Sequence, residues 1–253
     1  MKSLPSSVCP SMPRLLFSTL LLAAFSLHAQ EEKKDAATPA MREVSPGVYE
    51  IGSIHLDKNA RTVSFPAKLN MAEGNIEYLI CTPQGSTHES LLVTDVQPHE
   101  IHFAMLLLDA KGAGILAPAP GDAPPSQINA EYLKGAPRLK GDNITITTKW
   151  KDAAGKESTV AVEDWVLNAS NKKPTPRGPW IYTGSMFAED KFLAQLQGTI
   201  ASIVSNPAAL INNPRKGNDD DQIWVVNAKV VPPVETPLAI TLKLESTPEP
   251  KPK

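Results

Sequence analysis

Most of the side chains that could do chemistry lie in one segment, between Glu77 and His102. His99 and His102 are three positions apart, so on a helix they would share a face and could bind one metal ion. His88 or Glu77 could complete the three protein ligands of a divalent metal. One hypothesis is therefore a metal-dependent hydrolase that uses His88 and His102 with Glu77 or Glu89. The alternative is that His99 and His102 are ordinary residues at the exposed end of a helix.

Cys81 and His88 form a second possible pair. If residues 76–82 and 87–93 make a hairpin around a two-residue turn, Cys81 lies opposite His88 on one face of the sheet. A thiol beside an imidazole can be activated as a nucleophile. The alternative is that Cys81 packs as a small buried apolar side chain, which is the usual role of a free cysteine.

Three further side chains are candidates for binding a ligand. Tyr182, together with Trp180 and Trp224, could line a binding face with aromatic edges, although core packing is the commoner use. Ser185 follows in the sequence Tyr-Thr-Gly-Ser, which lacks the GxSxG pattern of serine hydrolases. Ser90 would share the predicted hairpin face with the thiol.

Composition and charge exclude several classes of protein. The formal net charge of −2 over 253 residues gives no electrostatic footprint for nucleic acid. The sequence contains no Walker motif and no dinucleotide-binding glycine motif. Only two cysteines are present, Cys9 and Cys81, so an iron–sulfur cluster, which normally takes four thiolates, is excluded. We expect no cofactor, with a divalent metal as the one alternative.

The N-terminus indicates export. Residues 1–29 carry only Lys2 and Arg14 as charges and contain the apolar stretch Leu15–Leu27, which is too short to span a bilayer comfortably. A signal peptide cut after Ala29 would leave a periplasmic or secreted protein without stable membrane insertion. An uncleaved anchor is the alternative.

The remaining chain divides into three parts. Residues 30–43 are charged and rich in Ala and Pro, which predicts a flexible segment. Residues 44–244 contain no internal repeat and predict a single domain, with a long proline-rich surface loop at 117–127. Residues 245–253 alternate in charge, contain three prolines and predict a disordered tail.

Strand signals dominate the domain, and 24 prolines favour many short segments over long helices. Alternation of apolar and polar residues predicts a strand at 144–150 that turns back into 158–162, and another at 238–244 whose hairpin partner is 223–230. Further strands are expected at Val48–Leu56, Thr62–Leu69, Ile76–Cys81, Trp180–Phe187 and Thr199–Val204.

One helix is predicted near 98–110. Pro98 suits its first turn, Glu100 complements the N-terminal dipole, and Ile101–Leu108 is apolar nearly all round. A helix that is apolar on every side is buried or covered by a sheet. The predicted fold is α+β and mainly β: an antiparallel, sandwich-like single domain with one buried helix.

The order of short phrases along the chain resembles the YdjY domain family of exported bacterial proteins. The phrases, which run from about Val44 to Leu244, are Thr62–Asn70, Ile76–Leu79, His88–Leu92, Ile101–His102, Met105–Leu108, Trp180–Ser185, Ala209–Asn212 and Trp224–Asn227. His99 lies outside the matching positions. The candidate residues that lie within them are Glu77, His88, Glu89, Ser90, His102, Tyr182, Gly184 and Ser185.

This resemblance implies an envelope protein, but the family has no established activity. Some members are labelled ferredoxin-like and others look like lipoproteins; this sequence lacks the cysteines for either. The expected function is a non-catalytic binding or structural module at the cell envelope, whose partner is an envelope component or a small ligand. The metal-dependent hydrolase remains the alternative.

Overall fold

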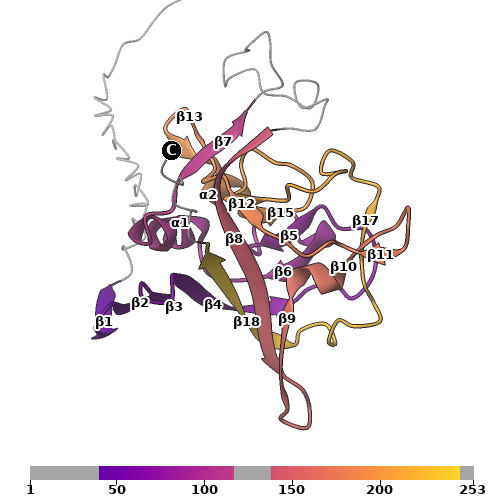
Figure 1. Ribbon diagram of the computed structural model, residues 1–253, viewed down its shortest axis with the longest axis horizontal. Coiled ribbons are helices and arrows are strands. Elements are labelled where there is room, and N and C mark those ends of the chain that lie inside the picture. The colour runs from indigo at the N-terminus through magenta and orange to yellow at the C-terminus, as the bar shows by residue number, and fades with distance from the viewer. Residues whose placement is uncertain (1–39, 117–137, 246–253) are drawn as a thin grey trace, which may run out of the picture. The chain divides into compact units, whose positions relative to one another are not determined.

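The structure, a computed structural model, describes residues 40–116 and 138–245 (Figure 1). The predicted signal peptide and cleavage site, the loop at 117–127 and all but the first residue of the predicted tail lie outside these residues. Strand β1 begins at Met41, inside the segment predicted to be flexible.

Eight strands form a closed barrel, which overturns the predicted sandwich. In order around the wall they are β4 (Thr62–Leu69), β18 (Pro237–Leu244), β8 (Arg138–Lys151), β12 (Trp180–Tyr182), β16 (Ile211–Asn212), β15 (Thr199–Ser202), β5 (Tyr78–Cys81) and β6 (Ser90–Val93). The barrel closes where β6 pairs with the end of β4, through Lys68 with Val93 and Leu69 with Leu92. Two pairs, β5–β6 and β15–β16, are parallel, so the sheet is mixed and not purely antiparallel.

The first half of β4 pairs instead with β3, which extends the sheet beyond the barrel. The other strands lie outside the closed wall: β1 (Met41–Ser45), β2 (Val48–Ile51), β3 (Ile54–Asp57), β7 (Gly112–Leu116), β9 (Glu157–Ala161), β10 (Val166–Asn168), β11 (Lys173–Pro174), β13 (Phe187–Ala188), β14 (Lys191–Phe192) and β17 (Trp224–Val226). β10, β11 and β17 form a small separate sheet, and β13 pairs with β14 in a two-stranded hairpin.

The predicted hairpin between 144–150 and 158–162 is confirmed as β8–β9. The predicted pairing of 238–244 with 223–230 is wrong, because β18 pairs with β4 and β8 while β17 pairs with β10. Alternation correctly identified the buried face of β18 but carries no information about which strand lies beside it.

The helical elements of the described residues are α1 (Pro98–Leu107), α2 (Leu193–Gln197) and the 3₁₀ turns η1 (Thr87–Glu89) and η3 (Val162–Trp165). α1 packs against β3, β4 and α2 through buried Ile101, Ala104 and Met105. Phe103 and Leu106 are exposed, so the helix is buried on one face only. The sequence had predicted a helix buried on every side.

Candidate ligand-binding site

His102 of α1 and Tyr182 of β12 are joined by a hydrogen bond of 2.6 Å between Nδ1 and the phenol oxygen. The His102 ring also packs on Phe192, with ring centroids 5.0 Å apart. Tyr182 is fully buried, and β12 pairs with β8 on one side and β16 on the other. The barrel wall therefore fixes the phenol, and the phenol orients the imidazole.

Two glycines allow the backbone to come close enough to form this site. A Cβ at Gly141 of β8 would lie 1.9 Å from the carbonyl oxygen of Tyr182, and one at Gly112 of β7 would lie 2.5 Å from that of Thr183. No side chain fits at either distance, so only glycine lets β7 and β8 approach the end of β12.

A pocket of about 470 Å³, which we call the His102 pocket, opens beside this pair. Its volume lies within the range of small-molecule sites. The lining side chains include His102, Leu106, Tyr182, Ser185, Met186 and Pro207. Three residues predicted from sequence for separate reasons, His102, Tyr182 and Ser185, therefore meet in one pocket.

Burial determines the charge of the hydrogen-bonded pair. It lowers the pKa of His102 below its ordinary value, so the imidazole is neutral at neutral pH, and it raises the pKa of the Tyr182 phenol. Within the described residues the phenol has no other acceptor, so it donates to Nδ1 and the ring proton lies on Nε2. The Nε2–H group of His102 is then a neutral hydrogen-bond donor.

Ser185 lines the pocket, but its hydroxyl is used within the protein. Its Oγ donates to the carbonyl of Ala208 at 2.7 Å and accepts from the N–H of Ala194 at 3.1 Å. These bonds connect the end of β12 to α2 and to the segment before β16. Their geometry suits a structural role better than that of a nucleophile.

Glu77, His88 and Glu89 form a second, separate group. Nε2 of His88 lies 3.5 Å from a carboxylate oxygen of Glu89, and the His88 side chain is 79% exposed. The pKa of Glu77 is raised, first by burial and then by the negative charges of Glu89 and Asp221; a hydrogen bond with Glu89 adds to this. Burial is what lowers the pKa of His102, and no carboxylate of the described residues contributes to that shift.

The predicted Cys81–His88 pair does not form. β5 and β6 run parallel, with η1 in the connection between them, so they are not the two arms of a hairpin. Cys81 is buried in the wall, where burial raises the pKa of its thiol, whereas His88 lies in the exposed turn. Ser90 is also fully buried; its hydroxyl donates to the carbonyl of Leu92 and lies away from the His102 pocket.

The predicted metal ligands are not gathered either. Among the described residues no group of three or more His, Cys, Asp or Glu side chains is placed to hold a metal ion. His99 does not join His102, because its Nδ1 lies 2.8 Å from Oε1 of Gln195 on α2. Packing of the two helices thus separates two histidines that helical spacing alone would have paired.

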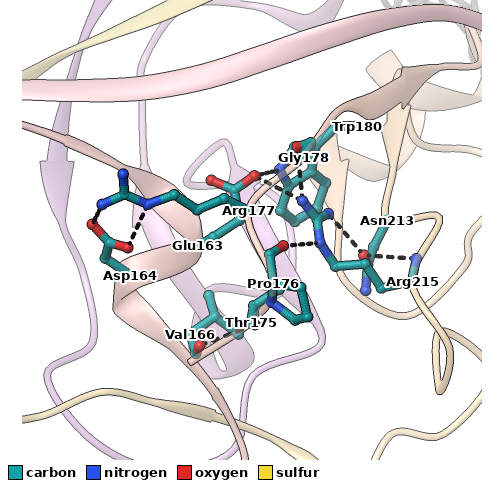
Figure 2. Close-up of polar contacts among 10 residues, drawn as sticks. All are labelled: Glu163, Asp164, Val166, Thr175, Pro176, Arg177, Gly178, Trp180, Asn213 and Arg215. Carbon is teal, nitrogen blue, oxygen red and sulfur yellow. Dashed lines mark hydrogen bonds and ion pairs between the residues drawn. The ribbon is translucent and has the colours of Figure 1, made fainter. Parts of the chain in front are cut away.

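Sequence reasoning missed a buried ion pair between Glu163 and Arg215, with an N–O distance of 2.7 Å (Figure 2). Trp180 donates its indole N–H to the same Glu163 oxygen, and the Arg215 guanidinium lies over the Trp180 ring. Arg215 also donates to the carbonyls of Pro176 and Gly178. No local pattern links residues 52 positions apart, so the sequence offered no signal for this cluster.

The fold and pocket define a class of protein: a closed mixed β-barrel with a ligand-sized pocket between its wall and a covering helix. The family model of the YdjY domain matches residues 54–243, and the chain belongs to the YdjY domain family. The resemblance inferred from the order of phrases is thereby confirmed. No curated protein and no solved structure matches the chain. Within the described residues, no helix has the length and apolar character needed to cross a membrane.

Proposed function

We propose that this YdjY-domain protein is an exported, non-catalytic module that binds a small molecule in the His102 pocket. The observation that carries the proposal is the His102–Tyr182 hydrogen bond, which holds a neutral donor in a fixed orientation at a pocket of ligand size. Fixed polar groups within a mainly apolar lining are typical of binding sites. The hydroxyl of Ser185, the candidate nucleophile in the pocket, is already hydrogen-bonded within the protein.

A pocket-filling variant tests the binding role. Ala113 lines the pocket and is exposed, so Ala113→Trp should fill the space without disturbing the core. A small-molecule library is screened by ligand-observed NMR against the wild type and this variant. The matched control is Ala153→Trp, which places the same side chain in the exposed β8–β9 turn. We expect ligands that bind the wild type and the control but not Ala113→Trp; equal binding by all three would refute the proposal.

Export is tested separately, by fractionation of the native host and mass spectrometry of the mature N-terminus. A chain that begins at Gln30 in the envelope or medium supports the proposal. A cytoplasmic chain with residues 1–29 still attached contradicts it.

The metal-dependent hydrolase is the alternative. Glu77, His88 and Glu89 lie near one another, but among the described residues they do not form a group that could hold a metal ion. The discriminating measurement is elemental analysis of untagged protein, followed by a hydrolase panel on the wild type and on His88→Ala. Stoichiometric metal and turnover that His88→Ala abolishes would replace the binding proposal with an enzyme. Metal far below one equivalent, with no turnover, would end the hydrolase hypothesis.

A further inference from the structure

Next to the His102 pocket lies a second hollow of about 620 Å³, lined by residues of the β13–β14 hairpin and α2. Met186 and Pro207 line both, so the two spaces share a wall. Aromatic rings follow the same path: His102 packs on Phe192 at 5.0 Å, and Phe192 packs on Phe187 at 5.1 Å between centroids. The shared residues and the ring contacts place the His102 pocket and the second hollow side by side, so one ligand could extend over both.

The far end of this surface exposes large apolar side chains. Phe187 is 65% exposed and Leu196 is 62% exposed, the highest values among the exposed large apolar residues of the described chain. Both line the second hollow, and Leu106, also exposed, lines the first. Apolar side chains gathered at a hollow, and not scattered singly, are typical of a binding groove.

The near end of the surface is complementary to an anion. Lys111 is the one lysine among its described lining residues, which include no Arg, Asp or Glu, and the neutral His102 adds a hydrogen-bond donor. Asp142 accepts from the backbone N–H of Lys111, but it does not line the pocket. Lys111 and a donor lie at one end, and the lining of the other end is mainly apolar, although it also includes Glu189 and Lys191. This pattern matches a carboxylate that carries an apolar chain.

We propose that the ligand is a free fatty acid with an acyl chain of about twelve carbons or more, with its carboxylate near His102 and Lys111 and its acyl chain along Met186 and the apolar surface of Phe187 and Leu196. This inference rests on the proposed function, because it names the ligand class of the same pocket. Phe187 and Leu196 both line the second hollow, so an acyl chain that reaches it from the His102 pocket would cover their exposed apolar surface.

The experiment is a titration of the full mature chain with sodium laurate below its micelle concentration, followed by isothermal calorimetry. Butyrate tests the need for the chain and dodecylamine tests the sign of the head group. We expect laurate to bind, and butyrate and dodecylamine to bind at least about tenfold more weakly, given the apolar area and charge that each lacks. Equal binding of laurate and butyrate, or stronger binding of dodecylamine, would overturn the proposal.

Variants locate the chain. The double variant Phe187→Ser/Leu196→Ser should weaken laurate binding by about tenfold or more. Val230→Ser, which alters an exposed apolar residue outside both hollows, should leave laurate binding unchanged. Circular dichroism checks that each variant is folded. If the double variant is not folded, Phe187→Gln and Leu196→Gln are measured singly, and no loss in either overturns the proposal.

Other occupants of the surface give different results. Binding to phosphatidylcholine vesicles in place of monomeric laurate would overturn the proposal in favour of a membrane surface. A dimer that Leu196→Ser dissociates, seen by sedimentation velocity, would overturn it in favour of a second copy of the chain. A polar library ligand that Ala113→Trp excludes and the double variant does not affect would overturn the fatty acid but preserve the proposed function. If every ligand binds Ala113→Trp as well as it binds the wild type, the proposed function itself fails.

Discussion

Replacement of Arg215 by methionine should destabilise the protein more than any change to an exposed ion pair. The side chains of Arg215 and Glu163 are 11% and 4% exposed, so Arg215→Met leaves a carboxylate buried with the Trp180 indole N–H as its remaining partner. Breaking one side of a buried pair costs about 3–5 kcal/mol, because the other charge stays desolvated. For a domain of this size such a loss lowers Tm by roughly 10 °C.

The same reasoning predicts strong coupling between the two partners. Glu163→Gln removes the buried charge but keeps an acceptor for the indole, so the double variant Glu163→Gln/Arg215→Met should be more stable than Arg215→Met alone. We expect a coupling free energy of about 2 kcal/mol, in the upper part of the range measured for contacting residues. The assay is urea denaturation of the four proteins, followed by circular dichroism so that changes near Trp180 do not distort the signal.

A neighbouring pair supplies the matched control. Arg177 contacts Asp164 through two hydrogen bonds in Figure 2, but its side chain is 70% exposed. Arg177→Met should therefore cost less than about 1 kcal/mol. If Arg215→Met costs no more than Arg177→Met, or if the coupling is below about 0.5 kcal/mol, burial is not what makes the Glu163–Arg215 pair important.

Three further predictions concern the candidate site residues. Burial lowers the pKa of His102 in the folded state, so the unfolded state binds more protons near that pH. The stability that neutral His102 contributes is therefore fully present above the unfolded pKa near 6.5 and is lost as the pH falls below it. His102→Asn should flatten this part of a Tm-against-pH curve, and an unchanged slope would contradict the assignment. The pKa of Glu77 is raised by burial and by Glu89, so Glu77→Gln should raise Tm at pH 7 and give a much smaller gain at pH 4, where the carboxyl is mostly protonated in both states. An equal gain at both pH values would count against repulsion. Tyr182→Phe should lower the free energy of unfolding by about 1 kcal/mol. It should also move the His102 ring proton from Nε2 alone to a mixture of the two tautomers, which is measured by the ring ¹⁵N chemical shifts. A wild-type ¹⁵N pattern would mean that the phenol does not set the tautomer.

The parts of the fold that the sequence predicts correctly are local. The β8–β9 hairpin follows from alternation around one turn, and α1 follows from Pro98 and Glu100, whose carboxylate accepts the Gln97 N–H at 3.0 Å. Closure of the barrel is not local, since it depends on two residue pairs between β4 and β6. The same phrases are compatible with a sandwich until that pairing is known, because both architectures bury alternate residues of each strand.

The site shows the same division. His102, Tyr182 and Ser185 were each identifiable by residue type. The contact between His102 and Tyr182, which lie 80 positions apart in the sequence, is visible only once α1 is packed on the barrel. His99 shows the opposite error, because its helical spacing from His102 was right and its partner, Gln195, comes from another helix. Spacing within one element predicts which side chains share a face; it does not predict what the neighbouring element brings to that face.

β12 connects the two polar clusters of the protein. Trp180 and Tyr182 are alternate residues of one strand, so their side chains leave it on the same face. Trp180 donates to Glu163 at one end, and Tyr182 meets His102 at the other. A wall strand of three residues is thus held by a buried carboxylate at one end and a half-buried imidazole at the other. The buried ion pair therefore supports the position of Tyr182, and through it the orientation of His102, although Arg215 does not line the pocket.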